Sequence, residues 1–172
     1  WAEYFQGKRV LNRGIGGDVT DGLLERMDES IFDLEPKKGF INIGTNDISR
    51  PEYKRERLMS QYRKILMQIQ ARLPETKIYV MSYYPVNREL PGADPEAVKA
   101  QFGARTNAEL KEVNAEVEKM AEELGCTYIN VFDCLLDEKS NLKAEYTIEG
   151  MHMYANGYAA VLEKLMPYLL EE

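Results

Sequence analysis

Short apolar runs alternate along this chain with longer amphipathic stretches, and this alternation constrains the fold more than any other feature of the sequence. Runs at Phe40–Ile43, Lys77–Met81 and Thr127–Val131 have the length and residue types of buried strands. Parallel strands need a crossover of a dozen or more residues between them, usually a helix. The alternation therefore predicts an α/β domain with a mostly parallel sheet.

The N-terminal part of the chain predicts another strand, a tight turn and a helix. Arg9–Asn12 is the strand candidate, and the glycine-rich turn Gly14-Ile15-Gly16-Gly17 follows it. Apolar residues then recur every four positions, at Val19, Leu23, Met27 and Ile31. This spacing predicts one helix, with Asp18 or Thr20 as its N-cap.

Three more helices complete the expected order. They are predicted from Pro51 to about Leu73, from about Arg105 to Leu124 with Gly125 as the stop, and after His152, where Pro167 should kink or restart the helix. The stretch from Tyr84 to Ala104 has no clear pattern and contains three prolines. We interpret it as a long loop, a type that is more often functional than accidental, although a simple surface insertion is an alternative.

Length and composition place the chain among single-domain globular proteins and exclude several function classes. The 172 residues fit one domain spanning 1–172, with 44% apolar and 30% charged residues. The net charge is −7 and no long Lys/Arg cluster occurs, which argues against a nucleic-acid partner. No run approaches the roughly 20 apolar residues of a membrane span. The two cysteines, Cys126 and Cys134, are expected to be reduced thiols.

The sequence constrains compartment and assembly only weakly. No signal peptide is visible, which slightly favours the cytoplasm, but the chain opens at Trp1 without an initiator Met, so a secreted protein with a removed leader is an alternative. A homo-oligomer is compatible with the sequence. No metal cluster or cofactor motif is visible in it.

Polar residues gather where a parallel sheet binds its ligands. In open parallel sheets this place lies beyond the carboxyl ends of the strands. Four segments are predicted to meet there: Gly14–Asp18, Gly44–Asp47, Ser82–Asn87 and the approach to His152.

Candidate groups for acyl transfer lie in these segments. His152, the only histidine, follows Glu149 by three residues, and a carboxylate can orient an imidazole and stabilise its protonated form. Asn46 follows a strand, so that its amide could donate to an oxyanion, and the backbone N–H groups at Gly16 and Gly17 precede a helix. Each also has a plainer interpretation: a solvated histidine, a loop acid, a turn asparagine and a tight turn.

Taken together, three blocks resemble those of the SGNH or GDSL-type hydrolases. Asn12-Arg13-Gly14-Ile15-Gly16-Gly17-Asp18-Val19-Thr20 resembles their glycine block, and Gly44-Thr45-Asn46-Asp47 their G-x-N-D block. Glu149-Gly150-Met151-His152, followed by Asn156-Gly157-Tyr158, resembles their final D-x-x-H block. The order and spacing agree over nearly the whole chain, and the branch most similar is that of platelet-activating-factor acetylhydrolases and sugar O-acetylesterases.

The resemblance implies a three-layer α/β/α, flavodoxin-like fold and a serine esterase acting on short acyl esters, acetyl above all, of a carbohydrate or small lipid. It implies that the Gly17 N–H and the Asn46 side chain form the oxyanion hole, and that His152 is the general base and then acid. Glu149 stands where the family usually has Asp as the residue that orients the histidine. A backbone carbonyl near this position is an alternative holder of the imidazole.

The family's Gly-Asp-Ser block is absent from this sequence. None of its serines, Ser30, Ser49, Ser60, Ser82 and Ser140, follows Gly-Asp. The resemblance implies an upstream segment with the nucleophilic serine and a first strand, which would lie between the strand at Arg9–Asn12 and the strand at Phe40–Ile43.

Two other functions compete with an active esterase. One is a catalytically inactive, sugar-binding relative, which the missing serine suggests. The other is a phosphate- or dinucleotide-binding module, which Gly14-x-Gly16 after a strand suggests. The third glycine of that fingerprint would fall at Val19, so the match to a dinucleotide-binding motif fails there.

Overall fold

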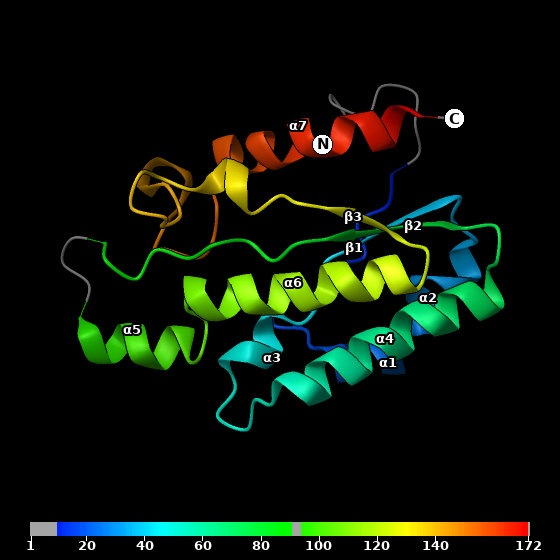
Figure 1. Ribbon diagram of the computed structural model, residues 1–172, viewed down its shortest axis with the longest axis horizontal. Helices are drawn as coiled ribbons and strands as arrows, with labels where there is room; N and C mark the ends of the chain where they lie inside the picture. The colour runs from blue at the N-terminus through cyan, green and yellow to red at the C-terminus, as the bar shows by residue number, and fades with distance from the viewer. Residues whose placement is uncertain (1–9, 91–93, 172) are drawn as a thin grey trace.

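A parallel sheet forms the centre of the molecule (Figure 1). The computed structural model describes residues 10–90 and 94–171. Within them the sheet has three strands in the order β1 (Lys38–Ile41), β2 (Lys77–Met81) and β3 (Thr127–Ile129). Both pairs are parallel, with Gly39 opposite Ile78 and Val80 opposite Tyr128. The predicted α/β class with a parallel sheet is confirmed.

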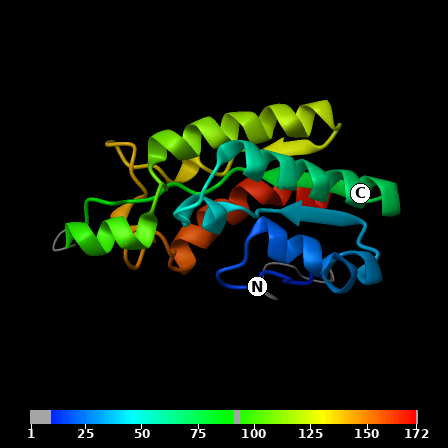
Figure 2. The same cartoon turned by 90° about the horizontal axis from the view of Figure 1, so that it is seen from below.

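Helices cover both faces of this sheet (Figures 1 and 2). In chain order they are α1 (Thr20–Glu25), α2 (Met27–Ser30), α3 (Thr45–Ser49), α4 (Arg55–Arg72), α5 (Pro95–Phe102), α6 (Asn107–Glu123) and α7 (Ala155–Leu170). Helices α4 and α6 are the two crossovers and lie on one face, with α1 packed against α4. Helix α7 lies on the opposite face, which completes three layers.

The side chains of β2 divide the core between the two faces. Ile78 and Val80 belong to the apolar cluster that includes the buried residues of α4 and α6. Tyr79 and Met81 belong to a second cluster, with Val161 of α7. Successive side chains of a strand point to opposite faces, so the apolar run of β2 fits a strand that is covered on both sides.

The first expected strand does not form in the described residues. Arg9 lies outside them, and Val10–Asn12 adopt no strand and are exposed. A strand is stable only with a hydrogen-bonded neighbour, and no described residue pairs with the free edge of β1. The other strands were placed correctly but with shifted ends: Lys38–Ile41 rather than Phe40–Ile43, and Thr127–Ile129 rather than Thr127–Val131.

The single helix expected over residues 19–31 is interrupted. Arg26, at φ −113° and ψ 19°, separates α1 from α2. Neither expected residue is the N-cap of α1; Val19 occupies that position and makes no side-chain cap bond. The carboxylate of Asp47 accepts a hydrogen bond from the backbone N–H of Thr20 instead, at 3.1 Å, so a neighbouring helix satisfies one of the free donors.

Three other helical predictions need correction. Helix α5 lies inside the expected loop, and α4 begins at Arg55 rather than Pro51 because α3 and a turn come first. Pro167 lies within α7, which continues to Leu170, so the helix does not restart there. The end of α6 agrees with the prediction, since Gly125 follows it at φ +68°, a conformation that favours glycine. Across the described ranges, no helix is both long enough and apolar enough to cross a bilayer.

Candidate active site

The polar segments singled out in the sequence lie on the carboxyl-end side of the strands (Figures 1 and 2). They are the glycine-rich turn before α1, helix α3 after β1, the segment after β2, and the loop that precedes α7. This is the side at which open parallel sheets bind ligands.

The glycine-rich turn has a backbone conformation that favours glycine. Gly17 has φ +77°, and the N–H of Asp18 donates to the carbonyl of Ile15 at 3.2 Å. A Cβ on Gly17 would meet no atom within 4 Å, so conformation rather than space selects glycine here. Gly17 is exposed, which leaves its backbone open to a ligand.

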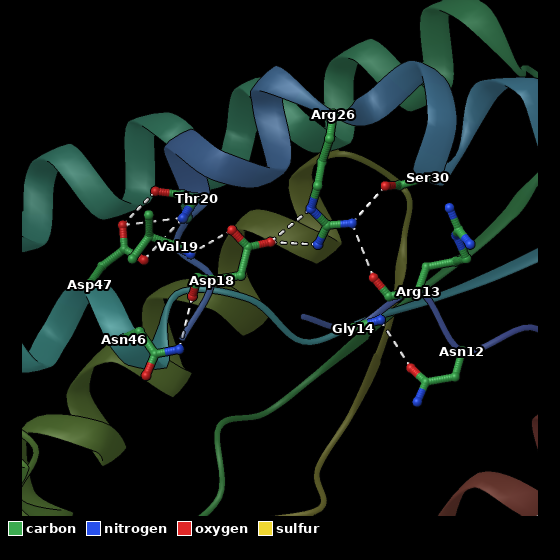
Figure 3. A network of polar contacts seen from close by, with 10 residues as sticks. All are labelled: Asn12, Arg13, Gly14, Asp18, Val19, Thr20, Arg26, Ser30, Asn46 and Asp47. Carbon is green, nitrogen blue, oxygen red and sulfur yellow. Dashed lines mark hydrogen bonds and ion pairs between the residues drawn. The ribbon is translucent and has the colours of Figure 1, made fainter. Parts of the chain in front are cut away.

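Helix α3 brings Asn46 to this turn. The Asn46 Nδ2 donates to the backbone carbonyl of Asp18 at 2.9 Å (Figure 3). The next residue, Asp47, accepts from the Thr20 hydroxyl at 2.5 Å as well as from its N–H. The side chains of α3 thus fix the start of α1, and Asn46 is bonded to the residue that follows Gly17.

An ion pair between Asp18 and Arg26, not foreseen from the sequence, links the end of the glycine-rich turn to the end of α1 (Figure 3). The Arg26 guanidinium contacts Asp18 Oδ2 at 2.5 Å and also donates to the Ser30 hydroxyl at 2.6 Å and the Arg13 carbonyl at 3.0 Å. Asp18 and Arg26 are eight residues apart, and Arg26 lies at the break between α1 and α2. No periodic pattern signals such a pair.

Glu149 and His152 form the second group of the site. The imidazole Nδ1 is in short contact with Glu149 Oε1. A carboxylate can only accept, so Nδ1 carries the proton and Nε2 is left as the acceptor. The His152 side chain is 69% exposed, which makes Nε2 accessible to a substrate group. The backbone N–H of His152 donates to the same Oε1 at 3.2 Å, so the two residues are held as one unit.

The loop that carries this pair is fixed by its backbone. Gly150 has φ +95°, and a Cβ there would lie 2.0 Å from the Asn87 carbonyl oxygen. The Asn87 N–H donates to the Gly150 carbonyl at 2.7 Å. The hydroxyl of Thr147 accepts from the Gly150 N–H and donates to the His152 carbonyl, each at 2.8 Å. Asn87 lies in the predicted edge segment, but its contact with Gly150 had no signal in the sequence.

The end of α5 lies between the two groups. Gly103, at φ +55°, approaches α3 so closely that a Cβ would lie 2.3 Å from the Ser49 carbonyl oxygen. The Ser49 hydroxyl in turn donates to the Asn46 carbonyl at 2.8 Å. On the other side, the Phe102 ring would lie 3.3 Å from a Cβ on Gly150. Helix α3 and the His152 loop therefore both pack against residues 102–103.

Three of the five serines in the sequence make hydrogen bonds away from His152. Ser82 is fully buried and accepts from the Val131 N–H at 2.9 Å. Ser30 and Ser49 are bonded to Arg26 and to the Asn46 carbonyl. No serine hydrogen-bonds His152 in the part of the chain that the structure describes, and no group of acidic, cysteine or histidine side chains there could hold a metal ion.

Comparison with known proteins decides the family. The model of the GDSL-like lipase/acylhydrolase family matches residues 1–160. The chain belongs to this family. Its membership identifies an enzyme that hydrolyses ester bonds.

Relatives of the GDSL-like chain include acetylhydrolases. Platelet-activating factor acetylhydrolase IB subunit alpha2 of Rattus norvegicus is 27% identical over 176 residues, covering 100% of this chain and 70% of the relative. A Streptococcus pneumoniae protein described as a candidate platelet activating factor is 30% identical, with a TM-score of 0.87 over 98% of this chain and 76% of its own. An acetylxylan esterase from Geobacillus stearothermophilus has the same fold at 18% identity, with a TM-score of 0.73 over 95% of this chain and 73% of its own.

Proposed function

We propose that this protein hydrolyses short acyl esters, acetyl esters above all, of a carbohydrate or small lipid by a serine esterase mechanism. The observation that carries the proposal is the contact of Glu149 Oε1 with His152 Nδ1, which leaves an exposed Nε2 free to accept a proton. This arrangement suits a general base whose protonated form a carboxylate stabilises.

The nucleophile in this proposal is a serine upstream of Trp1, as the family resemblance implies. The engagement of Ser30, Ser49 and Ser82 elsewhere in the fold supports this assignment. The serine hydroxyl attacks the ester carbonyl while His152 Nε2 takes its proton. His152 then gives this proton to the alcohol as it leaves, which produces an acyl-serine. Water attacks the acyl-serine while His152 Nε2 takes a proton from it, and His152 returns that proton to the serine oxygen as the carboxylic acid is released.

Gly17 and Asn46 stabilise the negative charge that develops on the carbonyl oxygen. The Asn46 amide has two N–H groups, and the bond to Asp18 occupies one of them at 2.9 Å. The second N–H and the backbone N–H of Gly17 are the donors of the proposed oxyanion hole. The bond to Asp18 orients the amide before the substrate arrives, so little reorganisation is needed during the reaction.

The relatives support the substrate class. The matched mammalian proteins are acetylhydrolases, and the esterase of similar fold is named for acetylxylan. Tyr154, two residues after His152, is 50% exposed and offers an aromatic face for a sugar ring or a short aliphatic group.

The test uses the complete native protein and p-nitrophenyl acetate. We expect His152→Ala to lower kcat by several orders of magnitude, because the base is lost. Asn46→Ala should lower kcat by roughly 100- to 1,000-fold, the effect of one oxyanion donor. Unchanged turnover in both variants would refute the assignment. Binding of acetylated sugars without any hydrolysis by the unsubstituted protein would favour the inactive, sugar-binding relative.

A further inference from the structure

A side chain from α5 reaches the candidate catalytic carboxylate. Gln101, in the last turn of α5, donates from Nε2 to Glu149 Oε1 at 3.3 Å. This is the oxygen that also faces His152 Nδ1 and the His152 N–H. Three donors from two separate segments therefore converge on one carboxylate oxygen.

The backbone beneath Gln101 is fixed by a buried arginine. Arg105 is 4% exposed, and its guanidinium donates to the Gln101 carbonyl at 2.7 Å and the Phe102 carbonyl at 3.2 Å. Burial lowers the pKa of Arg105, and no carboxylate in the described ranges offsets this effect. Its charge instead faces the negative end of α5, where a cation is favourable. This contact anchors the turn from which Gln101 extends.

A glutamate needs such support more than an aspartate does. Its carboxylate is separated from the backbone by one more rotatable bond, so that more conformational freedom must be lost to hold it against the imidazole. The loop fixes the backbone at Gly150, and the donors that it offers to the Glu149 carboxylate both come from His152 itself. The donor from α5 acts on the side chain itself.

We propose that Gln101 is a positioning residue, which holds Glu149 Oε1 against His152 Nδ1 and so maintains the imidazole orientation. This inference rests on the proposed esterase function for its catalytic consequence. The physical coupling of Gln101 to His152 through Glu149 does not depend on it, and the two are tested separately.

The coupling is tested by NMR titration of labelled histidine, which reports on His152 alone because the chain has one histidine. Gln101→Glu places a second carboxylate beside the pair and should raise the pKa of His152 by about half a pH unit at low ionic strength. Gln68→Glu on α4 makes the same charge change on a distant element and should leave this pKa unchanged. The charged side chains on the neighbouring segments, Arg88, Glu89 and Arg105 among them, are the same in all these variants.

The catalytic consequence is tested by kinetics in the complete protein. Gln101→Met removes the donor with little change of volume and should lower kcat about 3- to 10-fold with KM unchanged, because orientation rather than binding is lost. In a Glu149→Ala background the same substitution should have no further effect, since the group it positions is gone.

The NMR titration decides whether Gln101 is coupled to His152, and the kinetics decide whether this coupling matters for catalysis. An equal His152 pKa in Gln101→Glu and Gln68→Glu would overturn the coupling whatever the activity. A kcat loss from Gln101→Met that persists in the Glu149→Ala background would show that Gln101 acts on structure in general and would overturn the positioning role. A coupled pKa in a protein without esterase activity would contradict the proposed function but not the contact.

Discussion

Glu149 differs from the aspartate of the family pattern by one methylene group, and its contacts show how the longer side chain is accommodated. The bonds to His152 Nδ1, to the His152 N–H and to Gln101 all end on Oε1. The turn at Gly150 brings the His152 backbone back toward the carboxylate, so the loop compensates for the added length. The contact between Glu149 and the imidazole is therefore made by side chain rather than by a backbone carbonyl.

At this position, Glu149→Gln should reduce ester hydrolysis less than His152→Ala does. The neutral amide keeps an oxygen that accepts from Nδ1, but it cannot stabilise the imidazolium that forms during proton transfer. The measurement is kcat for p-nitrophenyl acetate in the complete protein. Glu145→Gln, at an exposed neighbouring position, is the matched control and should leave kcat unchanged. Equal losses in Glu149→Gln and His152→Ala would contradict this ranking.

The sequence pointed to candidate site residues one by one, and most of their hydrogen-bond partners had no signal in it. Glu149 and His152 are close in sequence and fell into one motif, and their contact follows from the loop they share. The bonds between Asp47 and Thr20 and between Gly150 and Asn87 join residues that are far apart in the chain. Such contacts depend on how the elements dock, which no local pattern records.

Among the elements, length decided how well each one was predicted. The crossover helices α4 and α6 and the helix α7 have long apolar faces, and each was expected close to its observed place. Helices α3 and α5 are too short to show a clear period, and α5 was assigned to a loop. Their positions come from contacts such as that of Gly103 with Ser49.

An ion pair between elements predicts a pH dependence of stability. Arg55, at the start of α4, contacts Glu109 Oε2 of α6 at 2.6 Å, and the Tyr53 hydroxyl donates to the same carboxylate at 2.7 Å. The hydrogen bond from Arg55 is the main cause that lowers the pKa of Glu109 below its usual value. A lowered pKa in the folded state adds stability above the unfolded pKa of about 4.3, which is lost as the pH falls through the folded value.

Arg55→Met should therefore lower the free energy of unfolding by about 1–2 kcal/mol at pH 7, since both side chains are only partly exposed. The loss should be smaller at pH 3, where the Glu109 carboxylate is closer to being protonated. Urea unfolding at the two pH values measures both. Arg57→Met removes a more exposed pair with Asp21 and should cost no more than about 0.5 kcal/mol. If Arg55→Met lowered the free energy of unfolding equally at both pH values, the contact with Arg55 would not be the cause of the lowered Glu109 pKa.

Over the whole molecule, two apolar clusters share one thin sheet. Leu66 of α4 belongs to the cluster on one face and Leu135, after β3, to the cluster on the other, and both are fully buried. The strands contribute alternate residues to both clusters. A substitution that removes packing from the cluster on one face is therefore expected to destabilise the cluster on the other face as well.

Unfolding in urea should accordingly be a single transition for the complete protein. Leu66→Ala and Leu135→Ala should each lower the free energy of unfolding by about 2–5 kcal/mol with unchanged slope, as for buried leucines elsewhere. Leu170→Ala, at a position 57% exposed, is the control and should have little effect. Two resolved transitions monitored by fluorescence and circular dichroism, or a variant that shifts only one of them, would show that the faces unfold independently.

Of the α-helices that the structure describes, α7 is the one that covers its face of the sheet, and this has a consequence for synthesis on the ribosome. Helices α4 and α6 are made between the strands they cover, so their face of the sheet can close while the chain is still growing. Helix α7 follows all three strands, and until it leaves the exit tunnel the apolar side chains of Tyr79, Met81 and Ile129 lack the one α-helix that, in the described part of the chain, covers them. The nascent protein should thus expose the apolar face of the sheet late in translation. A chaperone that binds apolar surfaces would bind it at this stage.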